Sequence, residues 1–364
     1  MDTRDEMTAA LREEPQPAPA RPFVHLHTHS AYSLLEGAVP LAKLMGLATT
    51  DGQPALAITD RSNLFGALEF SSKAAKEGLQ PIIGCTLEID FDDQSEGSRS
   101  GSTQQAMVAF PTLVLLASNE DGYQNLIRLV SLAYMEGAVE SRAHITLAQL
   151  IEHNDGLIVL TGGPDGPIDG MIADDHPAEA LARLQSLQKA FGDRRYIELQ
   201  RQAGYSPKRE GELLDMAYNL GIGIVATNEV FFAKRDDFDA HDTLICIAEG
   251  RMVSEDDRRR LTPDHYLKST AEMNLLFADL PEAIDNTTII AQRCAFAVQE
   301  LDPILPFFTG GKGDAPLAAE AAELRRQAIE GLKARLATHP LAKGYTREQY
   351  DERLEIELSV IENM

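Results

Sequence analysis

Three histidines stand at alternate positions near the start of the chain, in the run FVHLHTHSAYSLLEGA: His25, His27 and His29. Residues i, i+2 and i+4 of a β-strand share one face, so the run predicts a row of imidazoles at the end of a strand. Neutral imidazole is the commonest metal ligand among side chains. Histidines on a strand face also serve as hydrogen-bonded filling inside a barrel, so the row alone leaves both interpretations open.

Further polar residues follow other predicted strands. In a parallel barrel the carboxyl ends of the strands share the face on which active sites form. His, Asp and Glu that converge from separate strand ends are typical of a metal-dependent hydrolytic site, in which the metal lowers the pKa of a bound water. Besides the histidines, the residues expected at these ends are Glu36, Asp60, Arg61, Thr86, Glu88, Asn228 and Glu229.

Three other motifs are weaker candidates for a functional site. GGPDG at 162–166 follows a predicted strand but lacks the Lys and Ser/Thr of a P-loop, which favours a simple turn. His241 falls on a predicted helix, with Asp239 and Asp242 beside it, and is expected to cap or pack. The basic run RRR at 258–260 predicts a solvated surface segment.

The elements that must position these residues come from an alternation of short apolar runs with longer amphipathic ones. Repeated strand–helix units predict parallel strands with helices outside, and runs such as LVLLA are continuously apolar, as strands buried on both faces are. Seven units favour a closed barrel over an open sheet. The predicted strands are Phe23–His29, Ala55–Thr59, Pro81–Asp90, Leu113–Ser118, Gly156–Thr161, Arg195–Leu199 and Gly223–Asn228.

The remaining segments differ in composition. Residues 1–21 are acidic and then rich in Pro and Ala, which predicts a disordered lead-in, and the polar residues 91–110 predict a loop or hairpin insertion. After about residue 236 only helical patterns follow. The last of them, from Thr346, ends at Met364 without a stop signal, so we expect the natural protein to continue. If the end of the chain needs the missing part to fold, that helix should expose Leu354, Ile356, Leu358 and Ile361.

Composition limits the classes of function. The formal net charge is −24, with 57 acidic and 33 basic residues, and such a surface repels phosphate backbones. Tight binding of nucleic acid by this chain alone is therefore not expected. The cysteines Cys85, Cys246 and Cys294 form no paired framework, which predicts a reducing, cytoplasmic location. No run of about 18 apolar residues predicts a membrane span.

Several sequence blocks together resemble one family. FVHLHTHSAYSLLEGA, ALAITDRSNLFGALEF, GLQPIIGCTLEI, LVLLASNEDGYQNLIRLVSLAY and VATNEVFFAKRDDFDAHDTLICI are similar to the polymerase-and-histidinol-phosphatase (PHP) domain at the N-terminus of bacterial replicative DNA polymerase III alpha subunits. The likeness covers about residues 22–364. It implies an α/β fold, a (β/α)7 PHP barrel over 22–280, followed at 281–364 by a helical, truncated start of the polymerase palm.

The resemblance also implies a setting. The parent protein is a DNA-directed DNA polymerase that acts in DNA replication, and no segment here resembles its nucleotide-binding stretch or its catalytic aspartates. Catalytic residues are thus expected to be absent from this chain, with the Mg²⁺ of the parent polymerase bound elsewhere. The implied partners are the proofreading 3′–5′ exonuclease subunit, other holoenzyme subunits, and DNA through the parent polymerase, with no membrane.

Metal-binding members of the family keep two histidines where His27 and His29 stand, and they often have Asp where this chain has Glu36. Other ligand positions are altered, which implies a vestigial site in which at most His27, His29 and Glu36 hold one ion weakly and no cofactor is expected. The residues of this vestigial site are His25, His27, His29, Glu36, Asp60, Arg61, Thr86, Thr112, Gly163, Glu229 and Phe231.

The altered positions weaken metal binding for physical reasons. Arg61 replaces a histidine with a permanent cation that cannot become a ligand, Thr86 replaces a carboxylate, and Gly163 and Phe231 offer no donor. The family has a histidine near Thr112. We expect Arg61 to pair with Asp60, Glu36, Glu88 or Glu229.

Three functions stay open at this point. The first is a non-catalytic part of a replicative polymerase, whose barrel supports the palm and docks the exonuclease subunit. The second is an active metal-dependent phosphoesterase or 3′–5′ exonuclease, and the third is a stand-alone phosphatase for a small substrate. The altered ligand positions favour the first.

Overall fold

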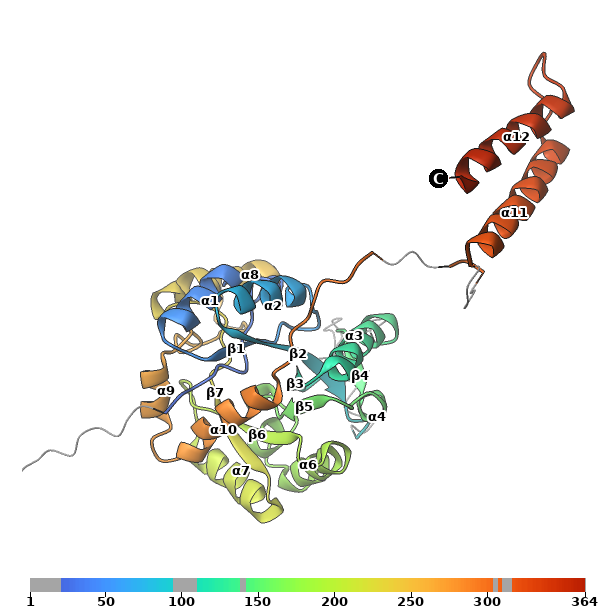
Figure 1. Ribbon diagram of the computed structural model, residues 1–364. Coiled ribbons are helices and arrows are strands. Elements are labelled where there is room, and N and C mark those ends of the chain that lie inside the picture. The colour runs from blue at the N-terminus through green and yellow to red at the C-terminus, as the bar shows by residue number, and fades with distance from the viewer. Residues whose placement is uncertain (1–20, 94–109, 138–141, 304–306, 310–315, 364) are drawn as a thin grey trace, which may run out of the picture. The chain divides into compact units, whose positions relative to one another are not determined.

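The computed structural model describes residues 21–93, 110–137, 142–303, 307–309 and 316–363. The chain divides into two compact units, Met1–Glu300 and Leu301–Met364 (Figure 1). The predicted lead-in at 1–21 and the insertion at 91–110 lie almost wholly outside the described residues. Among the described helices, none is long and apolar enough to cross a membrane.

The first unit is an α/β fold on one mixed sheet in the order β1-β2-β3-β5-β6-β7, with β4 also paired to β2. Six of the predicted strands are present, and the short β4 is an addition. The strands are β1 (Ala55–Ile58), β2 (Gln80–Asp90), β3 (Thr112–Ala117), β4 (His144–Thr146), β5 (Leu157–Leu160), β6 (Arg195–Gln200) and β7 (Gly223–Thr227).

The expectation of purely parallel strands is wrong for β3, which runs antiparallel to both β2 and β5. The other pairs, β1–β2, β2–β4, β5–β6 and β6–β7, are parallel. Parallel neighbours need a crossover connection, whereas antiparallel neighbours do not. β2 and β3 follow each other in the chain and pair directly, with no helix between them among the described residues.

The segment predicted as the first strand, Phe23–His29, makes isolated bridges instead of a regular strand. His25 bridges Leu56 of β1, and Thr28 bridges Val230 beyond β7. The amide of Ala57 donates to the carbonyl of His25 at 2.9 Å, and the amide of Val230 donates to that of His27 at 3.0 Å. The histidine segment therefore lies between the two edge strands of the sheet and joins them into a barrel.

Helices cover the outside of the sheet (Figure 1). Local signals set their ends. For example, Ser206 caps the amide of Arg209 where α7 begins, and Gly221 ends α7 with a φ of 61°. The helices of the first unit are α1 (Leu41–Thr50), α2 (Ala67–Lys76), α3 (Glu120–Met135), α4 (Leu147–Glu152), α5 (Asp169–Ala173), α6 (Pro177–Phe191), α7 (Pro207–Leu220), α8 (Phe238–Glu249), α9 (Thr270–Leu276) and α10 (Pro281–Arg293).

Helix α10 closes the end of the barrel where the strands begin. The side chain of Asn286 donates to the carbonyl of Ile224 at 2.7 Å, and that of Gln80 donates to the carbonyl of Ala291 at 2.6 Å. Ile290 and Cys294 belong to the same buried cluster as the inward-facing strand residues. The compact unit thus extends to Glu300, beyond the boundary expected at 280, because α10 buries its apolar face on the barrel.

The second unit consists of α11 (Pro316–Thr338) and α12 (Arg347–Glu362), joined by ion pairs from Arg325 to Glu355 and Glu362. Of the apolar residues singled out in α12, Leu358 is buried, whereas Ile356 and Ile361 are about half exposed. The expected exposure therefore applies to Ile356 and Ile361 and is wrong for Leu358, which faces away from solvent within this helix pair.

Candidate functional site

His27 is held in the barrel by a buried carboxylate. Its Nδ1 lies 2.7 Å from Oε1 of Glu198 on β6, and both side chains are fully buried. Glu198 also accepts hydrogen bonds from the amide of Gly162, from Gln200 and from the hydroxyl of Thr227. Burial lowers the pKa of His27, but Glu198 and Glu229 raise it by more, so the net shift is upward. The two carboxylates therefore stabilise the protonated form of His27 by more than burial destabilises it.

His29 has a different environment. Its Nδ1 lies 3.2 Å from the hydroxyl of Ser33, and its ring stacks on Phe231 with centroids 4.3 Å apart. Its Nε2 lies 3.5 Å from Oε1 of Glu229. Burial lowers the pKa of His29 and outweighs the opposite effect of Glu229. His29 is therefore held neutral, with one ring nitrogen facing a carboxylate.

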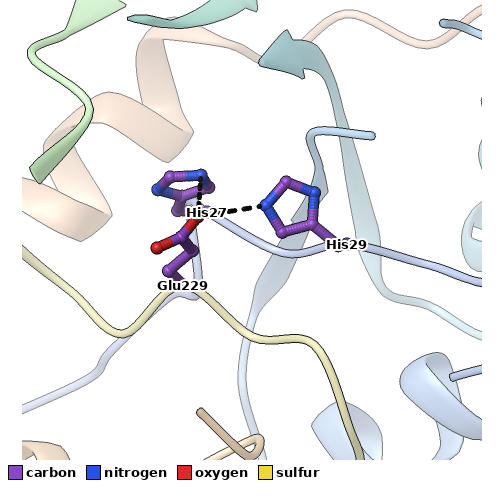
Figure 2. Close-up of side chains that lie close together, drawn as sticks. All are labelled: His27, His29 and Glu229. Carbon is purple, nitrogen blue, oxygen red and sulfur yellow. Dashed lines mark ion pairs between the residues drawn. The ribbon is translucent and has the colours of Figure 1, made fainter. Parts of the chain in front are cut away.

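Glu229 completes a group of three possible ligands. One donor atom from each of His27, His29 and Glu229 lies within 4.8 Å of the others, and all three side chains are buried (Figure 2). Glu229 has a φ of 46°, in the left-handed region that costs a non-glycine residue about 1 kcal/mol or more. Burial raises its pKa, but the two histidines lower it overall. The third possible ligand of this group is Glu229, whereas the sequence prediction named Glu36.

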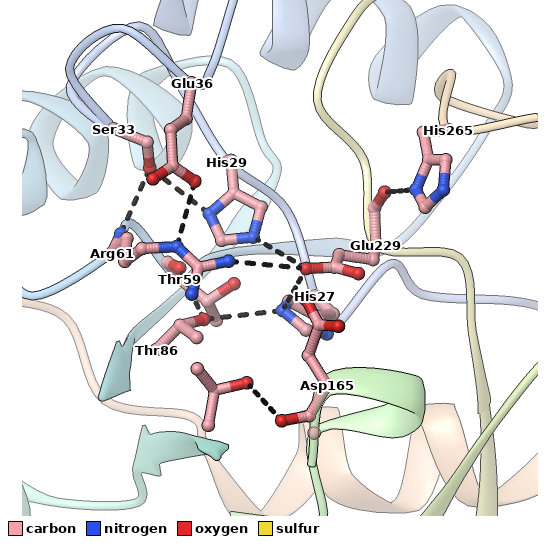
Figure 3. A network of polar contacts seen from close by, with 12 residues as sticks. His27, His29, Ser33, Glu36, Thr59, Arg61, Thr86, Asp165, Glu229 and His265 are labelled. Atoms are coloured by element: carbon pink, nitrogen blue, oxygen red, sulfur yellow. Dashed lines mark hydrogen bonds and ion pairs between the residues drawn. The ribbon is translucent and has the colours of Figure 1, made fainter. Parts of the chain in front are cut away.

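Arg61 reaches into the same cavity. Its Nε donates to Oε2 of Glu36 at 2.9 Å, and its second terminal nitrogen lies 3.8 Å from Oε1 of Glu229 (Figure 3). The Arg61 side chain is only 11% exposed. Burial lowers the pKa of this guanidinium, but Glu36 and Glu229 raise it by more. Arg61 thus faces the same carboxylate oxygen as the histidines do.

Two of the four carboxylates expected as partners of Arg61 therefore pair with it. Asp60 instead accepts hydrogen bonds from the amide and hydroxyl of Ser30 and from the hydroxyl of Ser33, each at 2.7 Å. Glu88 pairs with Arg142, whose Nε lies 3.0 Å from Oε1 of Glu88.

Glu36 is the centre of an arginine cluster. Besides Arg61, terminal nitrogens of Arg142 and Arg259 lie 3.5 and 3.4 Å from its carboxylate oxygens. Burial raises the pKa of Glu36, but Arg61 and Arg259 lower it overall. Glu36 is thereby committed to three cations, which explains why it is absent from the group of donors formed by the histidines.

The expectation that 258–260 is a solvated surface segment is wrong for two of its three residues. Arg259 contacts Glu36 in the site, and Arg258 forms a two-pronged ion pair with Asp242 of α8 at 2.6 and 2.7 Å. Only Arg260 is more than half exposed. The run lies on a segment that folds back over the strand ends, and sequence alone does not show which carboxylates face it.

The other predicted site residues are distributed around this group. The hydroxyl of Thr86 lies 3.4 Å from Nε2 of His27, whereas that of Thr112 donates to the carbonyl of Asp165 at 3.4 Å. Gly163 lies in a short 3-10 turn, where a Cβ would come within 2.6 Å of the Gln200 side chain. The turn expected at 162–166 is thus confirmed.

His25 does not join His27 and His29. Its Nε2 contacts the carbonyl of Lys268 at 2.8 Å, and its ring packs edge-on against Phe23. The single row of three imidazoles is therefore wrong, because this segment bridges its neighbours without the regular geometry of a strand. His241 packs against Phe232 and contacts the carbonyl of Glu36, as its packing role predicts.

Sequence reasoning missed Glu198 and His265. Glu198 lies in the strand RYIELQ, in which every residue is buried, and a carboxylate in a strand that is buried on both faces is the signal that could have found it. His265, whose Nδ1 lies 3.1 Å from the carbonyl of Glu229, stands in a loop without any pattern.

Comparisons with known proteins give the following similarities. Residues 25–202 match the family model described as "PHP domain". A DNA polymerase III subunit alpha of Caulobacter vibrioides is 48% identical over 345 residues, which cover 94% of this chain and 29% of that protein. The subunit of Rickettsia prowazekii is 37% identical over 352 residues, covering 94% and 28%.

Among solved structures, an amidohydrolase from Chromobacterium violaceum with bound sulfate and no metal gives a TM-score of 0.38 at 12% identity. That match covers 57% of this chain and 87% of the other. Compared with the polymerase subunits described above, the chain spans under a third of their length.

Proposed function

We propose that this chain acts within a replicative DNA polymerase and that its barrel is a non-catalytic support, because the chain belongs to the family of bacterial DNA polymerase III alpha subunits and carries their PHP domain. The barrel then carries the palm, whose helical lead-in we place at 281–364, and docks the proofreading exonuclease subunit. DNA and Mg²⁺ are engaged by the parent polymerase outside this chain. We propose the cytoplasm as its compartment.

The observation that carries this proposal is the position of Arg61. Its guanidinium pairs with Glu36 at 2.9 Å and lies 3.8 Å from the Glu229 oxygen that also faces both histidines. Two unit charges about 4 Å apart repel by about 4 kcal/mol at an effective dielectric of about 20, and a divalent ion feels about twice that. A cation beside Glu229 must therefore overcome a fixed positive charge.

The donor set suits a single metal ion and not a cluster. His27 and His29 provide two nitrogen atoms, and Glu229 provides one oxygen. This set suits a single Zn²⁺ or similar ion, which would polarise a bound water. The other nitrogen of His27 contacts Glu198, as histidine ligands usually do with a carboxylate. Among the described residues no second group of three donors adjoins this one, so the set does not fit a multi-metal centre.

Metal content decides between a support and an enzyme. We expect purified full-length chain to hold less than one Zn, Mn or Fe per molecule by mass spectrometry. We also expect no chelator-sensitive hydrolysis of bis-(p-nitrophenyl) phosphate. Two ions per chain, together with hydrolysis that EDTA abolishes, would overturn the proposal.

A double variant that is designed to bind more metal extends this test. The double change Arg61→His and Phe231→His removes the cation and adds two donors, and it should raise metal uptake if the donor geometry persists. Arg260→His adds a histidine at an exposed position outside the site and serves as the control. Equal uptake by both variants would mean that Arg61 is not what keeps metal out.

An active metal-dependent phosphoesterase or 3′–5′ exonuclease is the second candidate. The observation that favours it is the convergence of His27, His29 and Glu229 within 4.8 Å. One tightly held ion per chain with chelator-sensitive activity would support this candidate over the first.

The docking role has its own test. We expect the chain and the exonuclease subunit of the same polymerase to elute together from a sizing column in a one-to-one complex. Separate elution at concentrations of about 10 μM, above the Kd of most specific complexes, would remove the docking role and leave the support role standing.

A further inference from the structure

Exposed apolar side chains gather around one cavity at the mouth of the barrel. Leu34, Phe65 and Tyr134 are 66%, 65% and 54% exposed, and all three line a cavity of about 300 Å³. They come from three separate parts of the chain: the loop after the histidines, the segment before α2, and the end of α3. We call these three side chains the rim. Single exposed apolar residues are ordinary, but three that converge on one cavity mark an interaction surface.

The floor of this cavity is charged. Arg61, Arg142, Glu36 and Glu88 line it together with the rim. One terminal nitrogen of Arg61 is buried and has no hydrogen-bond partner among the described residues. The Arg142 side chain is 40% exposed, whereas those of Glu36 and Glu88 are 13% and 3% exposed and already engaged with arginines. The most exposed charged group of the floor is therefore the Arg142 guanidinium, so the charge that an incoming group meets first is positive.

We propose that this cavity docks an extended peptide segment of a protein partner. An acidic side chain of the segment accepts from Arg142, and its apolar neighbours pack on the rim. Aromatic and arginine side chains are the residues that most often dominate such contacts. The inference deepens the docking role proposed above and rests on it, and it adds the surface and the chemistry of the segment.

A peptide suits this surface better than a nucleic acid. The floor offers one largely exposed cation, Arg142, so a run of several phosphates gains little there. The net charge of −24 opposes a polyanion further. One carboxylate flanked by apolar side chains matches both the floor and the rim.

A peptide library tests the proposal without a known partner. Full-length chain is immobilised, and a random heptapeptide phage library is selected on it. Enriched peptides should carry Asp or Glu next to apolar residues. Their retention should fall about tenfold on Leu34→Ser and on Phe65→Ser. Ile247→Ser is the matched control, because Ile247 is 66% exposed on α8 and does not line this cavity.

The charge on the floor has a separate readout. Arg142→Gln should remove the preference for acidic peptides while the apolar preference persists. All variants are first compared with the parent chain by circular dichroism and thermal melting, so that lost retention reports the surface and not unfolding. Peptides without an acidic position, or equal retention on Leu34→Ser and Ile247→Ser, would overturn the proposal.

Two further outcomes separate this inference from the docking role. Binding of a fluorescent 15-nucleotide oligothymidylate that is lost with Leu34→Ser would place a nucleic acid here and overturn the proposal. A stable complex with the exonuclease subunit that forms equally well with Leu34→Ser, Phe65→Ser and the parent chain would also overturn it, and would leave the docking role intact.

Discussion

Arg61 is the residue whose surroundings decide what the barrel mouth can do. It is a buried cation between two buried carboxylates, Glu36 and Glu229, at the point where histidine nitrogens also converge. A buried ion pair adds little net stability compared with an apolar pair, but removing one partner leaves an uncompensated charge. The main contribution of Arg61 to stability is therefore to compensate the negative charge of these carboxylates.

We predict that Arg61→Met lowers the free energy of unfolding by roughly 1.5 to 3 kcal/mol, the range for the loss of a hydrogen bond to a charged group. Glu36 keeps its contacts with Arg142 and Arg259, so it is not left unpaired. Arg61→Lys should lose less, because it keeps the charge but not the planar fork. Urea denaturation at pH 7 measures both. Arg260→Met, at a position 52% exposed, is the control and should cost less than about 1 kcal/mol. Equal losses at positions 61 and 260 would contradict the account.

Part of this site followed from the sequence. His27, His29, Glu229 and Arg61 were expected together because each follows a strand and parallel strand ends share a face. Glu198 was missed because its strand was recognised by its apolar neighbours alone. The roles of Arg259 and His265 depend on how a loop far along the chain folds back, and no periodicity encodes that.

At the scale of elements, α8 and the segment after it are tied by the pair of Asp242 with Arg258. The hydrogen bonds from Arg258 lower the pKa of Asp242 below its usual range. An Asp with a lowered pKa in the folded state stabilises the protein above its unfolded pKa, which is about 3.9, and loses that contribution as the pH falls through the folded value.

We therefore predict that Asp242→Asn destabilises the chain at pH 7 by roughly 1.5 to 3 kcal/mol, the range for a hydrogen bond to a charged group, because both side chains of the pair are at most 6% exposed. The difference from the parent chain should shrink as the pH falls below about 4, where Asp242 of the unfolded chain becomes protonated before Asp242 of the folded chain. Free energies of unfolding from urea titrations at several pH values measure this. A difference that stays constant down to pH 2 would rule out the ion pair as its cause.

The sequence pattern does not predict the direction of β3. TLVLLA predicts a strand buried on both faces, and β3 is such a strand. An apolar run is equally compatible with a parallel and an antiparallel strand, so it does not set the direction. The extent of α10 is a similar case. Its pattern predicted a helix, whereas its membership of the barrel depends on Ile290 and Cys294 meeting strand residues that lie far away in sequence.

Thiol labelling can test the position of α10. Burial raises the pKa of Cys294, just after α10, and of Cys85 on β2 to about 12, so neither thiol is ionised at pH 8. We predict that iodoacetamide modifies neither one in the native chain and both in urea, as read by peptide mass spectrometry. Fast native labelling of Cys294 with Cys85 protected would show that α10 detaches from the barrel.

At the scale of the whole chain, the two units differ in how much they bury. The first has four buried clusters that surround the sheet, whereas Leu358 is the buried apolar residue of α12 in the second. Ile356 and Ile361 remain about half exposed. Two helices with so small a core are marginal on their own, because most helical stability in proteins comes from packing.

We predict that truncation after Glu300 leaves the melting temperature of the barrel within about 2 °C of the parent chain, since a change of about 1 kcal/mol shifts a domain of this size by about 2 to 4 °C. Residues 301–364 alone should show a low helical signal by circular dichroism. Leu358→Ala in the full chain should leave the barrel transition unchanged, which separates the two units in one molecule. A fall of 10 °C or more on truncation would mean that the barrel depends on the helices that follow it, and the division of the chain after Glu300 would have to be abandoned.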